Sequence, residues 1–281
     1  MSARSSAEID PQVARYYRSV AGKMLPYLAG RPAAVRLGAG SSFSRRDVDG
    51  PIHVNSGSEL SEWVEKGATA FFTSPIADSG EVWFTLALTG GDFPFEVVRL
   101  TALKLLLVLE DAELDGLFVY DGNGSVRLLW TFGVIDPDDI PGDLWRFQGN
   151  IASALQERVE ARLRATPERD RIGRWLGYEG AVTRLEGARI AAGRGRSAEP
   201  GGARGDVVVI STGAMTPKGL LRIPYSLNEA TGFASRPVTR SDLYRFERER
   251  HASPDHVRLL RRRFDIPLNL PRAVLRGLEL D

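Results

Sequence analysis

The residue that most clearly offers chemistry is an arginine inside an apolar segment. Arg222 follows Leu221 and precedes Ile223 in a predicted strand, with Lys218 shortly before it. Because successive side chains of a strand point to opposite faces, the guanidinium of Arg222 must emerge on one face of a sheet. Guanidinium groups bind phosphate and carboxylate oxygens well. Two interpretations stay open here: Arg222 binds the phosphate of a ligand, or it pairs with a buried carboxylate.

Most other catalytic chemistries lack their residues. The chain has no cysteine, which excludes cysteine nucleophiles and thiolate metal sites, and its three histidines (His53, His251 and His256) do not form a histidine-rich zinc motif. The glycine-rich segments lack the order G-x-x-x-x-G-K-[ST] of a phosphate-binding loop. Asp92 and Asp121 are favoured as turn residues over metal ligands. Glu81 is a further acid near the same strands.

The charged residues are divided unevenly along the 281 residues. Residues 1–157 carry 13 Lys and Arg against 21 Asp and Glu, a net charge of −8, whereas residues 158–281 carry 24 against 15, a net charge of +9. Such asymmetry points to a polyanionic partner for the basic part. The arginine-rich stretch 245–263 is interleaved with acids, which favours a solvated face over a phosphate-binding one.

The elements that must position these residues are helices and strands in alternation. Asp10 and Pro11 open an amphipathic helix that runs to Leu28. Residues 81–88 alternate as a strand and place Thr85 and Ala87 on the same face. Further strands are expected at 32–36, 70–73, 206–211 and 219–224, a hairpin at 117–132, helices at 60–66, 95–114, 144–163, 171–176 and from 241, and a loop at 192–205.

This order predicts an α+β fold with a mixed, largely antiparallel sheet flanked by helices. We expect an N-terminal helical and strand subdomain at 1–76, a core at 77–245 and an Arg-rich C-terminal tail at 246–281. The apolar runs are too short to span a membrane, and residues 1–12 lack the hydrophobic core of a signal peptide. We therefore expect a cytoplasmic protein with no membrane partner.

Two segments resemble a known family. Residues 14–32, ARYYRSVAGKMLPYLAGRP, resemble the start of the polymerase domain of bacterial DNA ligase D, a member of the archaeo-eukaryotic primase superfamily. Residues 220–238, LLRIPYSLNEATGFASRPV, resemble the superfamily's late motif, in which a strand carrying an arginine runs into a Pro-x-Ser-Leu turn. The resemblance covers about residues 10–245 and implies a primase-polymerase-like fold.

The resemblance also implies a site for template-directed nucleotidyl transfer. In that family, two carboxylates at i and i+2 of a strand and a third from a later strand hold two Mg²⁺ or Mn²⁺ ions about 4 Å apart. The corresponding positions in this chain are Thr85, Ala87 and Thr216, and none of them is acidic. The predicted site therefore has degenerate catalytic positions and no metal.

Other motif positions become basic or polar. Where the family has a histidine after the turn of the hairpin, this chain has Arg127, and Asn228 stands where related primases often have histidine. A face that lacks these acids and carries an additional arginine favours the binding of phosphate groups. The predicted residues for binding a nucleotide or nucleic acid are Arg36, Arg127, Lys218, Arg222, Ser226 and Asn228.

We therefore expect a ligase D polymerase-like pseudoenzyme that binds DNA, RNA or a nucleotide phosphate without a cofactor. The resemblance suggests a role in DNA repair, such as non-homologous end joining, or in replication, with end-joining or ligase proteins as partners. Two alternatives stay open. One is an active primase or polymerase with relocated ligands for Mg²⁺ or Mn²⁺, and the other is a scaffold for protein interactions.

Overall fold

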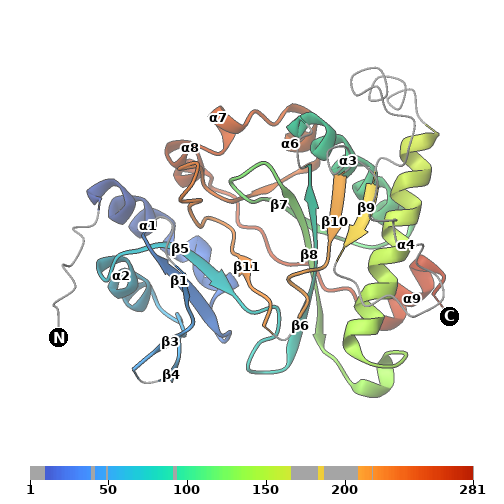
Figure 1. The fold of residues 1–281 in the computed structure, drawn as a ribbon, viewed down its shortest axis with the longest axis horizontal. Helices are drawn as coiled ribbons and strands as arrows, with labels where there is room; N and C mark the ends of the chain where they lie inside the picture. Colours follow the sequence, from blue (N-terminus) through green and yellow to red (C-terminus); the bar gives the residue numbers. More distant parts are fainter. Residues whose placement is uncertain are drawn as a thin grey trace.

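The computed structural model describes residues 10–38, 42–48, 50–90, 94–165, 183–186, 208–216 and 218–280. Figure 1 shows that these residues build two neighbouring sheets with helices on their outer sides. The elements in chain order are α1 (Pro11–Met24), η1 (Leu25–Tyr27), β1 (Ala33–Leu37), β2 (Phe43–Ser44), β3 (Arg46–Asp47), β4 (Gly50–Pro51), α2 (Gly57–Glu65), β5 (Ala68–Thr73), β6 (Glu81–Thr89), α3 (Phe95–Asp111), β7 (Leu117–Tyr120), β8 (Val126–Val134), η2 (Pro137–Asp139), α4 (Leu144–Arg164), β9 (Thr183–Glu186), β10 (Val208–Ser211), β11 (Leu221–Arg222), β12 (Arg236–Val238), α6 (Arg240–Arg245), α7 (Arg248–His251), α8 (Pro254–Leu259) and α9 (Pro271–Leu278).

The smaller sheet has the strand order β11-β5-β1-β2, and all its neighbours are antiparallel. Its helix α1 begins as the sequence predicts, because the Asp10 side chain accepts a hydrogen bond from the backbone amide of Gln12 and Pro11 occupies the first turn. The apolar residues of α1 recur at helical spacing, so Tyr17, Val20 and Met24 are fully buried. They form one core with the sheet and α2.

The larger sheet has the strand order β12-β7-β8-β6-β10-β9. Only the β9–β10 pair is parallel among its described strands, so the predicted α+β fold with a mixed, largely antiparallel arrangement is confirmed. One face of β6, with Phe84, Leu86 and Leu88, packs in a core with the helices α3 and α4. The opposite face of β6 carries Trp83, Thr85 and Ala87.

The two sheets are joined through the core that α1 and α2 form with the smaller sheet. Trp83 on β6 and Leu129 on β8 are buried in the same cluster as Tyr17 of α1 and Phe71 of β5. The strand expected at 219–224 is shorter, because only Leu221–Arg222 pair with β5. Through β11, a segment late in the chain completes the sheet that begins in the N-terminal region.

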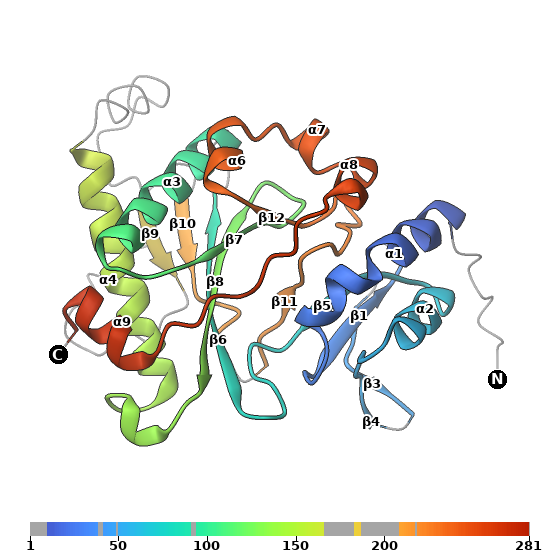
Figure 2. The same ribbon diagram turned by 180° about the vertical axis from the view of Figure 1, so that it is seen from behind.

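The C-terminal residues pack against both parts. Val257 of α8 is buried in the core of the smaller sheet, and Val274 and Leu278 of α9 are buried in the core of the larger one. Figure 2 shows the C-terminal chain passing over the near side of the larger sheet on its way to α9. The helix expected at 171–176 and the loop expected at 192–205 lie outside the described residues, and no described helix is long and apolar enough to cross a membrane.

Candidate nucleic-acid interface

The candidate site begins on the face of β6 that carries Thr85 and Ala87. In the antiparallel register, Ala87 lies opposite Arg127 of β8 on one side and opposite Ser211 of β10 on the other. Directly opposite residues of antiparallel strands point to the same face. Thr85, Ala87, Arg127 and Ser211 therefore share one surface, which we call the Thr85 face.

The third position that the sequence suggested, Thr216, lies elsewhere. β10 ends at Ser211, and Thr216 is an exposed residue of the following turn, where its backbone carbonyl accepts a hydrogen bond from the amide of Gly219. The sequence alignment placed this position by its spacing before Arg222, and the structure has a turn there, between β10 and β11. The structure places Ser211, and not Thr216, beside Ala87.

The Thr85 face does not fit a pair of catalytic metal ions. Mg²⁺ and Mn²⁺ prefer carboxylate oxygens, and the neighbouring positions on the three strands are threonine, alanine, serine and arginine. Among the residues that the structure describes, no group of three or more His, Cys, Asp or Glu side chains is placed to hold a metal ion. Asp92, one acid that the sequence offered as a substitute, lies outside the described residues.

Two polar groups on the Thr85 face have unused hydrogen-bonding capacity. The Thr85 hydroxyl is buried with no partner, and so is the Nε of Arg127. The Arg127 guanidinium donates one hydrogen bond through Nη1 to the carbonyl of Arg222 at 3.3 Å. Burial lowers the pKa of Arg127, and the nearby Arg222 charge lowers it further, although Asp121 acts in the opposite direction. A half-buried cation with so few partners requires an explanation beyond folding.

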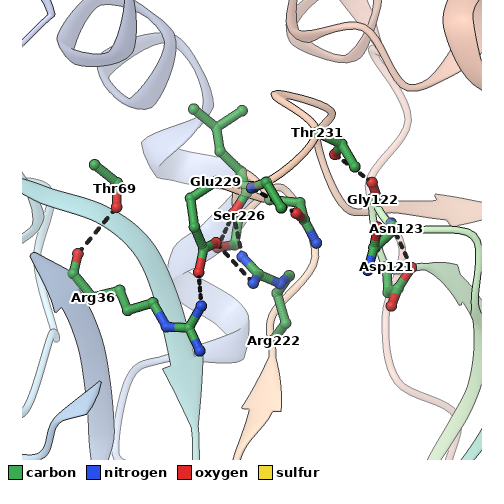
Figure 3. A network of polar contacts seen from close by, with 12 residues as sticks. Arg36, Thr69, Asp121, Gly122, Asn123, Arg222, Ser226, Glu229 and Thr231 are labelled. Atoms are coloured by element: carbon green, nitrogen blue, oxygen red, sulfur yellow. Dashed lines mark hydrogen bonds and ion pairs between the residues drawn. The ribbon is translucent and has the colours of Figure 1, made fainter. Parts of the chain in front are cut away.

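Arg36 and Arg222 converge on one carboxylate. Arg36 of β1 forms an ion pair through Nη1 with Oε1 of Glu229, and Nη2 of Arg222 lies 2.9 Å from Glu229 Oε2. Figure 3 shows the Glu229 carboxylate between the two guanidinium groups. Its side chain is only 6% exposed, so Glu229 is the buried carboxylate that the second interpretation of Arg222 required.

The charges in this cluster do not cancel. Burial by itself raises the pKa of Glu229, but a hydrogen bond from its own backbone amide and the Arg222 and Arg36 guanidiniums together hold this pKa below its usual value. Glu229 is therefore ionised at neutral pH. Arg36, Arg127, Arg222 and Glu229, which we call the arginine cluster, carry three positive charges against one negative charge.

Aromatic rings support the two paired arginines. The Arg36 guanidinium lies 4.4 Å from the centre of the Phe43 ring, and that of Arg222 lies 4.6 Å from the Phe72 ring. The two rings contact each other edge to face, with centroids 4.7 Å apart. Phe43 is 40% exposed, so an apolar ring lies at the surface beside the cluster.

The loop that presents Glu229 is held by the Pro-x-Ser-Leu turn. Ser226 is buried and its hydroxyl accepts a hydrogen bond from the backbone amide of Phe71 at 2.9 Å, while Asn228 Oδ1 accepts from the amide of Ala230. Tyr225 adopts a left-handed backbone conformation with φ +70°, and its carbonyl accepts from the Tyr16 hydroxyl. Ser226 and Asn228 thus shape the loop, while Glu229 faces the arginines.

The helix α1 also fixes this loop. The Tyr17 hydroxyl donates to the carbonyl of Thr69 and accepts from the amide of Leu227. Burial raises the pKa of Tyr17 to about 12, so its hydroxyl stays neutral and makes both bonds. The segment 14–32 and the segment 220–238, which carried the family resemblance, are therefore in contact.

The remaining predicted residues lie at the edges of the site. Lys218 is exposed in the loop before β11, and its carbonyl accepts a hydrogen bond from Arg45. Asp121 caps the hairpin turn by accepting hydrogen bonds from the amides of Asn123 and Ser125, as expected for a turn residue. Beside it, the Thr231 hydroxyl donates to the carbonyl of Gly122, which joins the hairpin to the Glu229 loop (Figure 3).

Glu81 is occupied by a different arginine. Its carboxylate lies 2.8 Å from Nη2 of the buried Arg31 and accepts hydrogen bonds from Trp83 Nε1 and the Thr131 hydroxyl. The Arg31 guanidinium also stacks on the Trp83 ring at 3.5 Å from its centre. Glu81 therefore belongs to a separate pair at the junction of the two sheets.

Sequence reasoning missed Glu229 and Ser211. Glu229 directly follows Asn228 in the late motif, so an acid close in sequence to a strand arginine was the available signal. Nothing in the sequence distinguishes Ser211 from other serines. Its importance comes from the strand register alone.

Comparison with known proteins supports the fold. No family model matches this chain, and a search of curated proteins found no match. Among solved structures, the polymerase domain from Mycobacterium tuberculosis ligase D in complex with DNA matches with a TM-score of 0.64 and 16% identity, over 92% of this chain and 93% of that one. The chain therefore has the fold of this polymerase domain, as the resemblance implied.

Proposed function

We propose that this protein uses a primase-polymerase fold to bind the phosphates of nucleic acid, DNA or RNA, without catalysing metal-dependent nucleotidyl transfer. The observation that carries the proposal is the arginine cluster beside the Thr85 face. Where the resemblance implies carboxylates for metal ions, the face has Thr85, Ala87 and, by register, Ser211, and the adjacent Arg127 is a half-buried cation whose Nε has no partner.

Charge explains why phosphate is the expected ligand. Three arginines against one glutamate leave an excess of two positive charges in a partly buried site, where screening by solvent is weak. Arg127 has no carboxylate partner among the described residues, so a phosphate oxygen would satisfy its unused donors. The exposed Phe43 ring beside Arg36 would stack on a base of a single strand.

The matching solved domain is described in complex with DNA, which supports a nucleic-acid ligand for the shared fold. We extend the proposal to a role in DNA repair, such as end joining, or in replication, with end-joining or ligase proteins as partners. We also propose a cytoplasmic location. In such a role the protein would hold a nucleic-acid end while a separate catalytic chain acts on it.

The binding test is fluorescence anisotropy with a labelled single strand and a labelled duplex with a 3′ overhang, each as DNA and as RNA, over a range of salt concentrations. We expect affinity that falls as salt rises, because phosphate contacts release counterions. The Arg127→Met variant should bind about tenfold more weakly and show a salt slope smaller by about one.

Arg276→Gln is the matched control. Arg276 is an exposed arginine of α9, so its replacement removes one positive charge without touching the arginine cluster. Equal affinity of the wild type and Arg127→Met, or equal losses in both variants, would remove the proposal. Primer extension with Mg²⁺ or Mn²⁺ tests whether the protein catalyses nucleotidyl transfer. We expect no incorporation of nucleotides, and template-directed extension would support the alternative of an active polymerase.

A further inference from the structure

A cavity of about 740 Å³ lies away from the arginine cluster, at the opposite end of β7 from the hairpin turn. β12 ends at Val238, opposite Phe118, so the first residues of β7 extend past it. The space beside them is lined by the start of α6 and by residues of the segment 262–267, which belongs to the C-terminal chain that passes over the near side of the larger sheet in Figure 2. None of the lining residues belongs to the arginine cluster.

Hydrogen bonds to the backbone hold both walls of this cavity apart. On the α6 side, Arg99 donates to the carbonyls of Leu243 and Tyr244, and Thr239 and Asp242 form a reciprocal cap. On the other side, the Tyr27 hydroxyl donates to the carbonyl of Phe264, and the amide of Thr131 donates to the carbonyl of Pro267 at 2.8 Å. The cavity is therefore preformed and has a volume suited to a small organic molecule.

The cavity is apolar at its base and basic at its rim. Leu106, Phe118, Val238 and Pro267 supply apolar surface. The charged lining residues are Arg240, Arg262, Arg263 and Asp265. Arg240 pairs with Glu110, and Arg262 stacks on the ring of Phe264. Neither Arg262 nor Arg263 forms an ion pair in the part of the chain that the structure describes, so the charges of two arginines that line the cavity remain uncompensated.

We propose that this cavity binds a small organic phosphate whose apolar or aromatic body lies on the Phe118 and Val238 surface and whose phosphate meets Arg262 and Arg263. Arginine side chains bind phosphate oxygens well, and both arginines line the cavity. The apolar base favours a ligand with an apolar body, which inorganic phosphate lacks. The site gives a function to the consecutive arginines of the C-terminal region that the arginine cluster does not use.

Isothermal titration calorimetry with AMP, adenosine and inorganic phosphate tests this inference. AMP should bind in the millimolar range or more tightly, and each fragment more weakly than AMP. Arg263→Ala and Arg262→Ala should each raise the Kd for AMP about tenfold, because each removes charge-assisted hydrogen bonds. Asp265→Asn should lower this Kd, since it removes the one acid among the described residues that line the cavity.

Arg261→Ala is the control, because Arg261 is exposed and adjacent to Arg262 but does not line the cavity. No saturable heat with AMP, or an unchanged Kd in both Arg262→Ala and Arg263→Ala, would overturn the proposal. Loss of AMP binding in Arg127→Met with retention in Arg263→Ala would also overturn it, while leaving the proposed function intact. The two sites are thus tested independently.

Discussion

Two groupings of arginine and carboxylate side chains in the described part of the chain are partly buried between the two sheets, and they differ in charge balance. In the first, Arg31 meets Glu81, and Trp83 and Thr131 complete the hydrogen bonding of the carboxylate. In the second, Arg36 and Arg222 share Glu229, and Arg127 adds a further charge. The first is a neutral pair, whereas the second has an excess of two positive charges.

This difference separates a structural contact from a candidate binding site. A neutral pair has no net charge to attract an added anion, and removal of one partner leaves an uncompensated, partly buried charge. A cluster with excess charge and unpaired donors on Arg36 and Arg127 gains from an anion. Mutations of the Arg31–Glu81 pair should therefore change stability more than nucleic-acid binding. Mutations of the arginine cluster should change binding more than stability.

The largest expected effect is on stability, in the Arg31–Glu81 pair. Arg31→Met should lower the free energy of unfolding by about 3 kcal/mol, because it leaves a partly buried carboxylate without its cation. Urea denaturation followed by tryptophan fluorescence measures this change. Nucleic-acid affinity of the folded variant should match that of the wild type. A variant as stable as the wild type would show that the junction is held by apolar packing alone.

The next effect is on binding, at Arg127. Arg127→Met should change the free energy of unfolding by less than about 1 kcal/mol, because an apolar side chain replaces a half-buried cation with few partners. Its affinity for single-stranded DNA should fall about tenfold. Denaturation and anisotropy on the same preparation check both values. A large loss of stability with unchanged affinity would show that Arg127, like Arg31, stabilises the fold and does not bind the ligand.

A smaller effect of opposite sign is expected at Glu229. Glu229→Gln keeps the shape of the side chain and removes its negative charge, which frees Arg36 and Arg222 for phosphate. Affinity for single-stranded DNA should rise about fivefold. Glu81→Gln, which makes the same change in the neutral pair, is the matched control and should leave affinity unchanged. A lower affinity in Glu229→Gln would show that Glu229 positions the arginines for the ligand.

The smallest effect is on the pH dependence of stability. Burial acts to raise the pKa of Glu81 and of Glu229, but hydrogen bonds and arginines outweigh it, so both values lie below the ordinary 4.5. A carboxylate with a depressed folded-state pKa stabilises the fold above its unfolded-state pKa. This contribution should disappear as the pH falls from about 4.5 through the folded values.

Thermal unfolding between pH 3 and pH 6 measures this dependence. Glu81→Gln and Glu229→Gln should each flatten the curve in the acid range, since each removes one titrating group. If both variants show the same pH dependence as the wild type, other carboxylates cause the loss of stability in acid.

Local pattern predicted most of the elements. The cap at Asp10, the alternation in β6 and the apolar spacing of α1 and α3 are properties of short segments, so they can be read without knowing the partners. The extent of β11 was predicted less well, because pairing with β5 limits it to two residues. Strand ends depend on the neighbouring strand, which lies far away in sequence.

For the site, the sequence by itself determined which residue types are available: no acid at Thr85 or Ala87, an arginine at 127 and another at 222. Only the tertiary structure decided how they combine. Strand register placed Ser211 beside Ala87, and the loop after the Pro-x-Ser-Leu turn brought Glu229 between Arg36 and Arg222. Charge is a property of each residue, but its balance within a site depends on which distant residues the fold brings within a few ångströms.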